Sequence, residues 1–181
     1  MGESPLDATG DEIPADSGGM AAPLRVPLFR RIWLASLLSN FGSLIQGVGA
    51  AWAMTQLTSS AGMVALVQTA SMMPVLLISL VAGALADVFD RRVIALIGLA
   101  FSLVSASILA ILTGAGLITP TLLLVFCFAI GTGMSLLGPA WQASVSEQVP
   151  TSVLPAAIAL NGISYNIARS FGPALGGIIV A

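Results

Sequence analysis

Long apolar runs separated by short polar segments dominate the chain after residue 27. Each run is about 20 residues long or longer, the length with which an α-helix crosses the hydrocarbon core of a bilayer. The pattern predicts an all-α, multi-pass membrane protein. The expected transmembrane helices cover residues 32–54, 63–86, 93–112, 122–143 and 156–181.

The composition agrees with this pattern. Hydrophobic residues make up 57% of the 181 residues and charged residues 8%, whereas soluble domains carry about 25% charged residues. No basic patch is large enough for nucleic acid. The chain has no histidine and a single cysteine, Cys127, so we expect neither a metal site nor a bound cofactor.

Residues 1–27 differ from the rest because they are polar, acidic and rich in Gly and Pro. Such a segment buries too little apolar surface to fold alone, so we expect a disordered cytoplasmic tail followed by a membrane domain over 28–181. Its acidic start does not resemble a secretory signal peptide.

Arginine placement predicts the orientation. Arg25, Arg30 and Arg31 precede the first expected helix, and Arg91 and Arg92 follow the second. The positive-inside rule puts both segments in the cytoplasm, because the two loops on the other side contain no Lys or Arg. The loop over 144–155 would also be cytoplasmic, although it has no arginine.

Polar side chains inside the first, second and fifth expected helices are candidates for a solute cavity, because buried polar groups in a membrane need a partner. Two of these residues have an alternative interpretation. Asn40 would belong to a packing stripe of small residues. Arg169 would reach the cytoplasmic interface with its long side chain. The candidates are Asn40, Gln46, Gln68, Asn161, Tyr165, Asn166 and Arg169.

The segment Gly83-Ala-Leu-Ala-Asp-Val-Phe-Asp-Arg-Arg92 concentrates four of the chain's charges between two apolar runs. It resembles the signature loop between the second and third helices of the major facilitator superfamily, Gly-x-Leu-Ala-Asp-Arg/Lys-x-Gly-Arg/Lys-Arg/Lys. Val88 and Asp90 depart from that signature. Further stretches are similar to its enterobactin-exporter-like branch, the transmembrane secretion effectors: Arg-Arg-Ile-Trp-Leu at 30–34, Ala-Leu-Val-Gln-Thr-Ala at 65–70, Pro-Ala-Trp-Gln-Ala at 139–143 and Asn-Ile-Ala-Arg at 166–169.

This resemblance implies a transporter of 12 helices in two halves that works by alternating access, of which this chain would supply the first five helices of the N-terminal half-bundle. It also implies a cytoplasmic latch that holds one conformation. The alternative is that these charges only anchor a solvated loop, where exposed ion pairs contribute about 0–1 kcal/mol. The latch residues would be Gly83, Asp87, Arg91, Arg92 and Glu147.

The stretch over 172–177 resembles the end of the fifth-helix motif of drug and proton antiporters, and close helix packing is the simpler interpretation. The motif residues are Gly172, Pro173, Gly176 and Gly177. The family's fourth-helix arginine is absent, and Cys127 stands in its expected place. None of the five spans contains Asp or Glu, so a carboxylate that carries protons would lie outside this chain.

These features favour a secondary active exporter of small amphipathic molecules, of the siderophore or drug class, in a bacterial plasma membrane. It would need a C-terminal half or a second chain. The alternative is a truncated, non-transporting fragment or a membrane scaffold. An intramembrane enzyme is disfavoured, because the spans hold no paired nucleophile and base and no two carboxylates.

Overall fold

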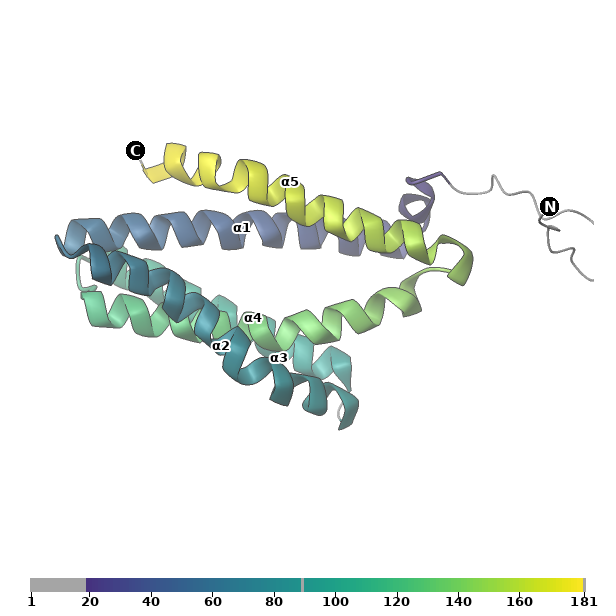
Figure 1. Ribbon diagram of the computed structural model, residues 1–181, viewed down its shortest axis with the longest axis horizontal. Helices are drawn as coiled ribbons and strands as arrows, with labels where there is room; N and C mark the ends of the chain where they lie inside the picture. The colour runs from purple at the N-terminus through teal and green to yellow at the C-terminus, as the bar shows by residue number, and fades with distance from the viewer. Residues whose placement is uncertain (1–18, 89, 181) are drawn as a thin grey trace, which may run out of the picture.

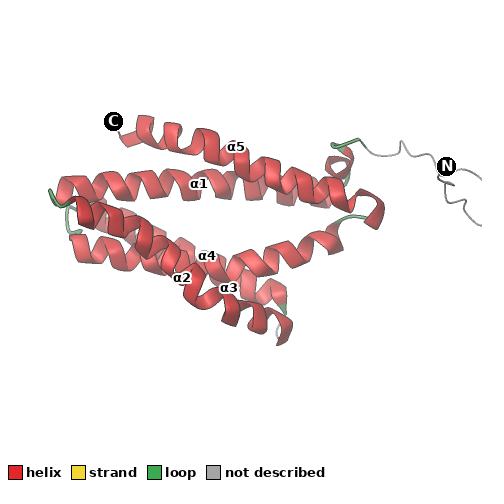
Figure 2. Ribbon diagram, in the orientation of Figure 1, coloured by secondary structure: helices red, strands yellow, loops and turns green. Residues whose placement is uncertain are grey.

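The computed structural model describes residues 19–88 and 90–180 of the chain, with side-chain positions for all of these except 79–88, 91–92, 138–144 and 146–147. Within this part of the chain there are helices and turns only (Figures 1 and 2). The long helices are α1 (Pro27–Leu57), α2 (Ala61–Val88), α3 (Arg91–Gly114), α4 (Pro120–Gln148) and α5 (Leu154–Val180), and two short 3-10 helices are η1 (Ala22–Arg25) and η2 (Thr151–Val153).

Prolines and a hydroxyl cap set the helix starts. Pro27 occupies the first turn of α1 and Pro120 that of α4, where the absent N–H would have no helical partner. Thr119 precedes α4, and its side-chain oxygen accepts a hydrogen bond from the backbone N–H of Leu122 at 3.3 Å. Such a cap satisfies one of the free donors at a helix N-terminus.

Two segments differ from the sequence-based expectation. The tail was expected to be disordered up to residue 27, but η1 buries Pro23, and Leu24 packs against an apolar cluster that contains Phe29. The loop expected from residue 144 begins only at Val149, because α4 continues to Gln148. Val149 is extended, as the residue before Pro150 tends to be, and this ends the helix.

The helices form two groups. In one, α4 packs against both α2 and α3; in the other, α1 packs against α5 (Figure 1). Two apolar clusters join the groups, one at each end of the bundle. The first contains Ala50, Met54, Val67, Leu109, Ile118, Leu123 and Cys127, and the second contains Phe29, Val145, Val149, Ala157 and Leu160.

Glycines in α4 allow its close approach to both neighbours. A Cβ atom on Gly131 would collide with the carbonyl oxygen of Ser71 in α2. A Cβ atom on Gly133 would lie 2.5 Å from the carbonyl oxygen of Gly98 in α3. Helix contact through small residues is the usual way in which helices associate in membranes, where lipid offers no hydrophobic drive.

By length and composition, three helices among the described residues are apolar enough to cross a membrane: Ala61–Ile78 in α2, Val93–Gly114 in α3 and Pro120–Leu137 in α4. We expected five such segments. Helices α1 and α5, with 31 and 27 residues, are also long enough to cross a membrane. Six of the seven candidate cavity residues lie on this pair, and the seventh, Gln68, lies on α2.

Candidate solute-binding face and hinge loop

Among the described residues, a hydrogen bond and two close glycine contacts join α1 and α5, in addition to the apolar cluster around Phe29. The indole Nε1 of Trp33 donates to the carbonyl oxygen of Leu160 at 2.9 Å. Further along, a Cβ atom on Gly172 would lie 2.9 Å from Cβ of Leu44, and one on Gly176 would lie 3.0 Å from Cβ of Val48. The contacts follow the same order along both helices, so α1 and α5 run parallel.

The expected packing motif therefore divides into two kinds of residue. Gly172 and Gly176 are buried against α1. Pro173 is exposed, and a Cβ atom on Gly177 would meet nothing within 4 Å. Among the described residues, only the two buried glycines of the motif form the helix contact.

Arg169 lies near the middle of α5, about 22 Å along the helix from Leu154 at a rise of 1.5 Å per residue. Its side chain is exposed on the surface of the bundle. Tyr165 lies one turn earlier and is 50% exposed. Residues four apart share a helix face, so the phenol and the guanidinium are neighbours on one surface of α5.

Asn40 belongs to the same level of the bundle. It lies one turn before Leu44 on α1, and Arg169 lies about one turn before Gly172 on α5. Because Leu44 contacts Gly172 and the helices are parallel, Asn40 and Arg169 are at a similar depth. The side chain of Asn40 is half-buried.

The other polar residues of α5 are engaged differently. The amide nitrogen Nδ2 of Asn166 donates to the carbonyl oxygen of Gly162 at 2.9 Å, a bond within its own helix. The Oδ1 atom of Asn161 is buried and has no hydrogen-bond partner among the described atoms. Asn161 thus offers a free acceptor, whereas Asn166 has already used a donor.

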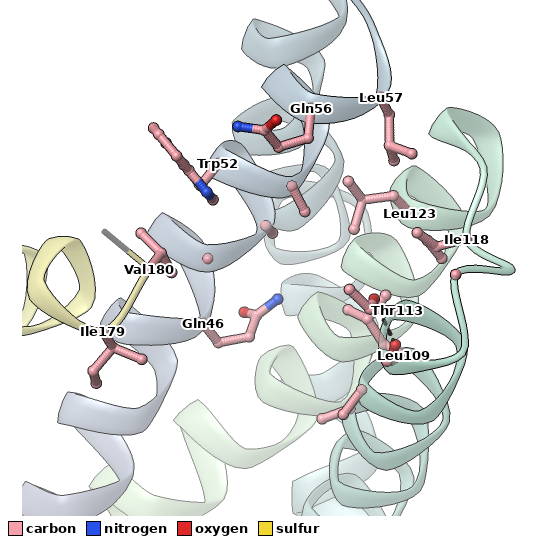
Figure 3. Close-up of a pocket in the computed structure, with 17 residues that line it drawn as sticks. Gln46, Trp52, Gln56, Leu57, Leu109, Thr113, Ile118, Leu123, Ile179 and Val180 are labelled. Atoms are coloured by element: carbon pink, nitrogen blue, oxygen red, sulfur yellow. Dashed lines mark hydrogen bonds between the residues drawn. The ribbon is translucent and has the colours of Figure 1, made fainter.

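Gln46 faces a different space. It lines an apolar cavity of about 800 Å³ between α1 and α3 (Figure 3). Its Nε2 atom is buried and has no hydrogen-bond partner among the described atoms. Gln46 lies six residues after Asn40, so the two side chains leave α1 on different faces.

Cys127 lies near Gln46, whereas the candidate Gln68 lies on another helix. The buried thiol of Cys127 in α4 lies beside the side chains of Gln46 and Ser71. Gln68 is exposed on α2, which packs mainly against α4. The sequence-predicted cavity set is therefore spread over at least two surfaces, and Asn40, Tyr165 and Arg169 form the group that shares a depth.

The connection between α2 and α3 is shorter than the expected bounds, which left residues 87–92 between the two helices. Helix α2 ends at Val88 and α3 begins at Arg91. The carbonyl oxygen of Asp90 accepts hydrogen bonds from the backbone N–H groups of Val93 at 3.0 Å and Ile94 at 3.2 Å, which starts α3.

The side chains of the predicted latch lie outside the described part of the chain. These are Asp87, Arg91, Arg92 and Glu147, and Gly83 lies in the same segment of α2. The contact between Arg91 and Glu147 therefore stays a prediction.

Comparison with known proteins identifies the family. The profile of the transmembrane secretion effectors matches residues 18–181, which is nearly the whole chain. The chain belongs to this family of the major facilitator superfamily. It is a multi-pass membrane protein.

Two curated relatives of this secretion effector chain carry functional names. It is 28% identical over 151 residues to the staphyloferrin A transporter of Staphylococcus aureus, covering 81% of this chain and 37% of that protein. It is 29% identical over 158 residues to the multidrug efflux pump Tap of Mycobacterium tuberculosis, covering 83% of this chain and 37% of the pump. The chain thus spans about 37% of the length of these relatives. No solved structure matches it significantly.

Proposed function

We propose that this chain forms the first five helices of a secondary active exporter that moves small amphipathic molecules of the siderophore or drug class. The observation that carries the proposal is the α1–α5 face, where a guanidinium lies exposed in the middle of a membrane helix beside a phenol. An ionisable side chain at that depth normally faces a water-filled path or a protein partner. The relatives named as a siderophore transporter and an efflux pump support the same class of function.

Transport requires a second half around which the bundle can alternate, either downstream sequence or a second chain. The tail and the hinge loop would lie in the cytoplasm, with the bundle in a bacterial plasma membrane. Any proton-carrying carboxylate within the membrane would come from the second half, because residues 28–86, 93–146 and 148–181 contain no Asp or Glu.

The hinge supports a role in switching between states. Helix α2 ends at Val88 and α3 begins at Arg91, so Asp87 and Arg91 lie at the adjoining ends of two helices that both pack against α4. We infer that Asp87 and Arg91 form part of a cytoplasmic latch whose making and breaking shift the balance between two conformations.

The experiment is an efflux assay with Nile red, a neutral amphiphile, in a bacterial host whose main pumps are deleted. The chain is expressed with the coding sequence that follows codon 181, and separately alone. Active export in the first case, lost when the membrane potential and proton gradient are collapsed, supports the proposal. No export from the longer product contradicts it and favours the fragment or scaffold.

A further inference from the structure

The charge of Arg169 has no counterpart at its depth in the bundle. The acids of the membrane domain, Asp87, Asp90 and Glu147, all lie near helix ends. Among the described residues, no hydrogen bond or ion pair involves the Arg169 guanidinium. A buried or membrane-embedded cation normally pairs with an anion, so the partner of Arg169 comes from outside these five helices.

We propose that Arg169, with Tyr165 and Asn40, forms a recognition site for the oxyanion group of the transported solute, chiefly a carboxylate on an aromatic or apolar body. The inference rests on the proposed function and adds the substrate class. The guanidinium presents a planar fork of donors that matches a carboxylate in a bidentate arrangement. A long side chain on a helix leans toward the N-terminus, which brings the Arg169 guanidinium toward Tyr165.

The neighbours suit the rest of such a solute. The phenol ring of Tyr165 offers an aromatic surface and a hydroxyl, and the Asn40 amide at similar depth offers a further donor. The rival source of the counter-charge is an acid of the second half, which would bind Arg169 permanently and leave nothing for the solute. A solute carboxylate and a permanent acid partner are distinguished by measuring the electrostatic potential beside Arg169.

The reaction rates of a single cysteine with charged reagents report the electrostatic potential beside Arg169. Replacing Cys127 by serine removes the one thiol of residues 1–181, and any cysteine encoded downstream is replaced in the same way. Gly162→Cys then places one thiol two turns from Arg169 on the same face of α5. A Cβ atom at Gly162 meets nothing within 4 Å, so the substitution fits. The reporter is placed in membrane vesicles that contain the chain together with its downstream sequence, and its reaction rates with anionic 2-sulfonatoethyl and cationic 2-(trimethylammonio)ethyl methanethiosulfonate are compared.

We expect the ratio of anionic to cationic reaction rates to fall about tenfold on Arg169→Gln, because a unit charge at this distance shifts the two reagents in opposite directions. Arg169→Lys keeps the charge and should keep most of the ratio. An equal ratio in the unsubstituted and Arg169→Gln proteins would show that an acid already neutralises Arg169, and would overturn the proposal.

Protection identifies the ligand class. We expect 2-naphthoate to slow labelling of the reporter by the cationic reagent at concentrations about tenfold lower than its neutral analogue 2-naphthamide, and Arg169→Gln to abolish the difference. Equal protection by both compounds would also overturn the site. If the protein exports Nile red but 2-naphthoate protects the reporter no better than 2-naphthamide, the anion site alone is refuted. If the protein exports nothing, the proposed function is refuted.

Discussion

The indole of Trp33 donates a hydrogen bond to the carbonyl oxygen of Leu160, and this pairs the second turns of two helices that lie far apart in the sequence. The same interface continues through Gly172 and Gly176. Helix α5 therefore has a fixed depth and rotation relative to α1. That fixed register puts Tyr165 and Arg169, which share one face of α5, at a depth similar to that of Asn40.

Trp33→Phe tests the hydrogen bond itself. The phenyl ring of Phe remains aromatic but is smaller than the indole and has no donor, so we expect the free energy of unfolding in detergent to fall by at least about 1 kcal/mol. Trp52→Phe is the matched control, since Trp52 is 47% exposed and the change should have little effect. Equal losses for both variants in a denaturant titration would argue against a specific role of the Trp33 bond.

Gly172→Ala tests the close contact of α5 with α1. The new methyl would lie 2.9 Å from Cβ of Leu44, which is not the end of a flexible chain, so a helix must move. We expect a loss of about 1–3 kcal/mol, seen as an earlier transition in fluorescence-detected thermal size-exclusion. Gly177→Ala introduces the same methyl into open space and should be neutral or slightly stabilising, because alanine favours helix. The reverse order of the two variants would contradict the described interface.

Arg91 and Glu147 test the latch. If they pair in one transport state, Arg91→Gln and Glu147→Gln should each reduce Nile red export, and the two effects should not add. The exchange Arg91→Glu with Glu147→Arg should restore part of the export. Independent, additive effects, or no recovery in the exchanged variant, would favour charges that only anchor a solvated loop.

Much of the fold follows from the sequence because long apolar runs and proline positions define membrane helices. The presence and order of the five long helices illustrate this, although α1 begins five residues and α4 two residues before the expected bound. The end of α4 was placed too early, since Ser144 and Glu147 are polar and yet remain helical up to the extended Val149. Polarity alone does not end a helix when it continues beyond the membrane.

The faces of the helices were harder to predict. Asn40 and Gln46 are both polar residues of one apolar helix, and the sequence does not show that Gln46 lines the α1–α3 cavity whereas Asn40 lies at the depth of Arg169, in the proposed solute site. The bond from Trp33 to Leu160 was also missed, because a tryptophan near a helix end suits the membrane interface equally well. Such distinctions depend on which neighbour each helix packs against.

The most direct test of the account is the water accessibility of residue 169. In the Cys127→Ser background, Arg169→Cys and Ile167→Cys place one thiol at nearly the same depth of α5, about 200° apart around the helix. We predict that an impermeant, charged thiol reagent labels position 169 and not position 167. Equal labelling of both positions, or labelling of 167 alone, would contradict the claim that the Arg169 face lines a solute path.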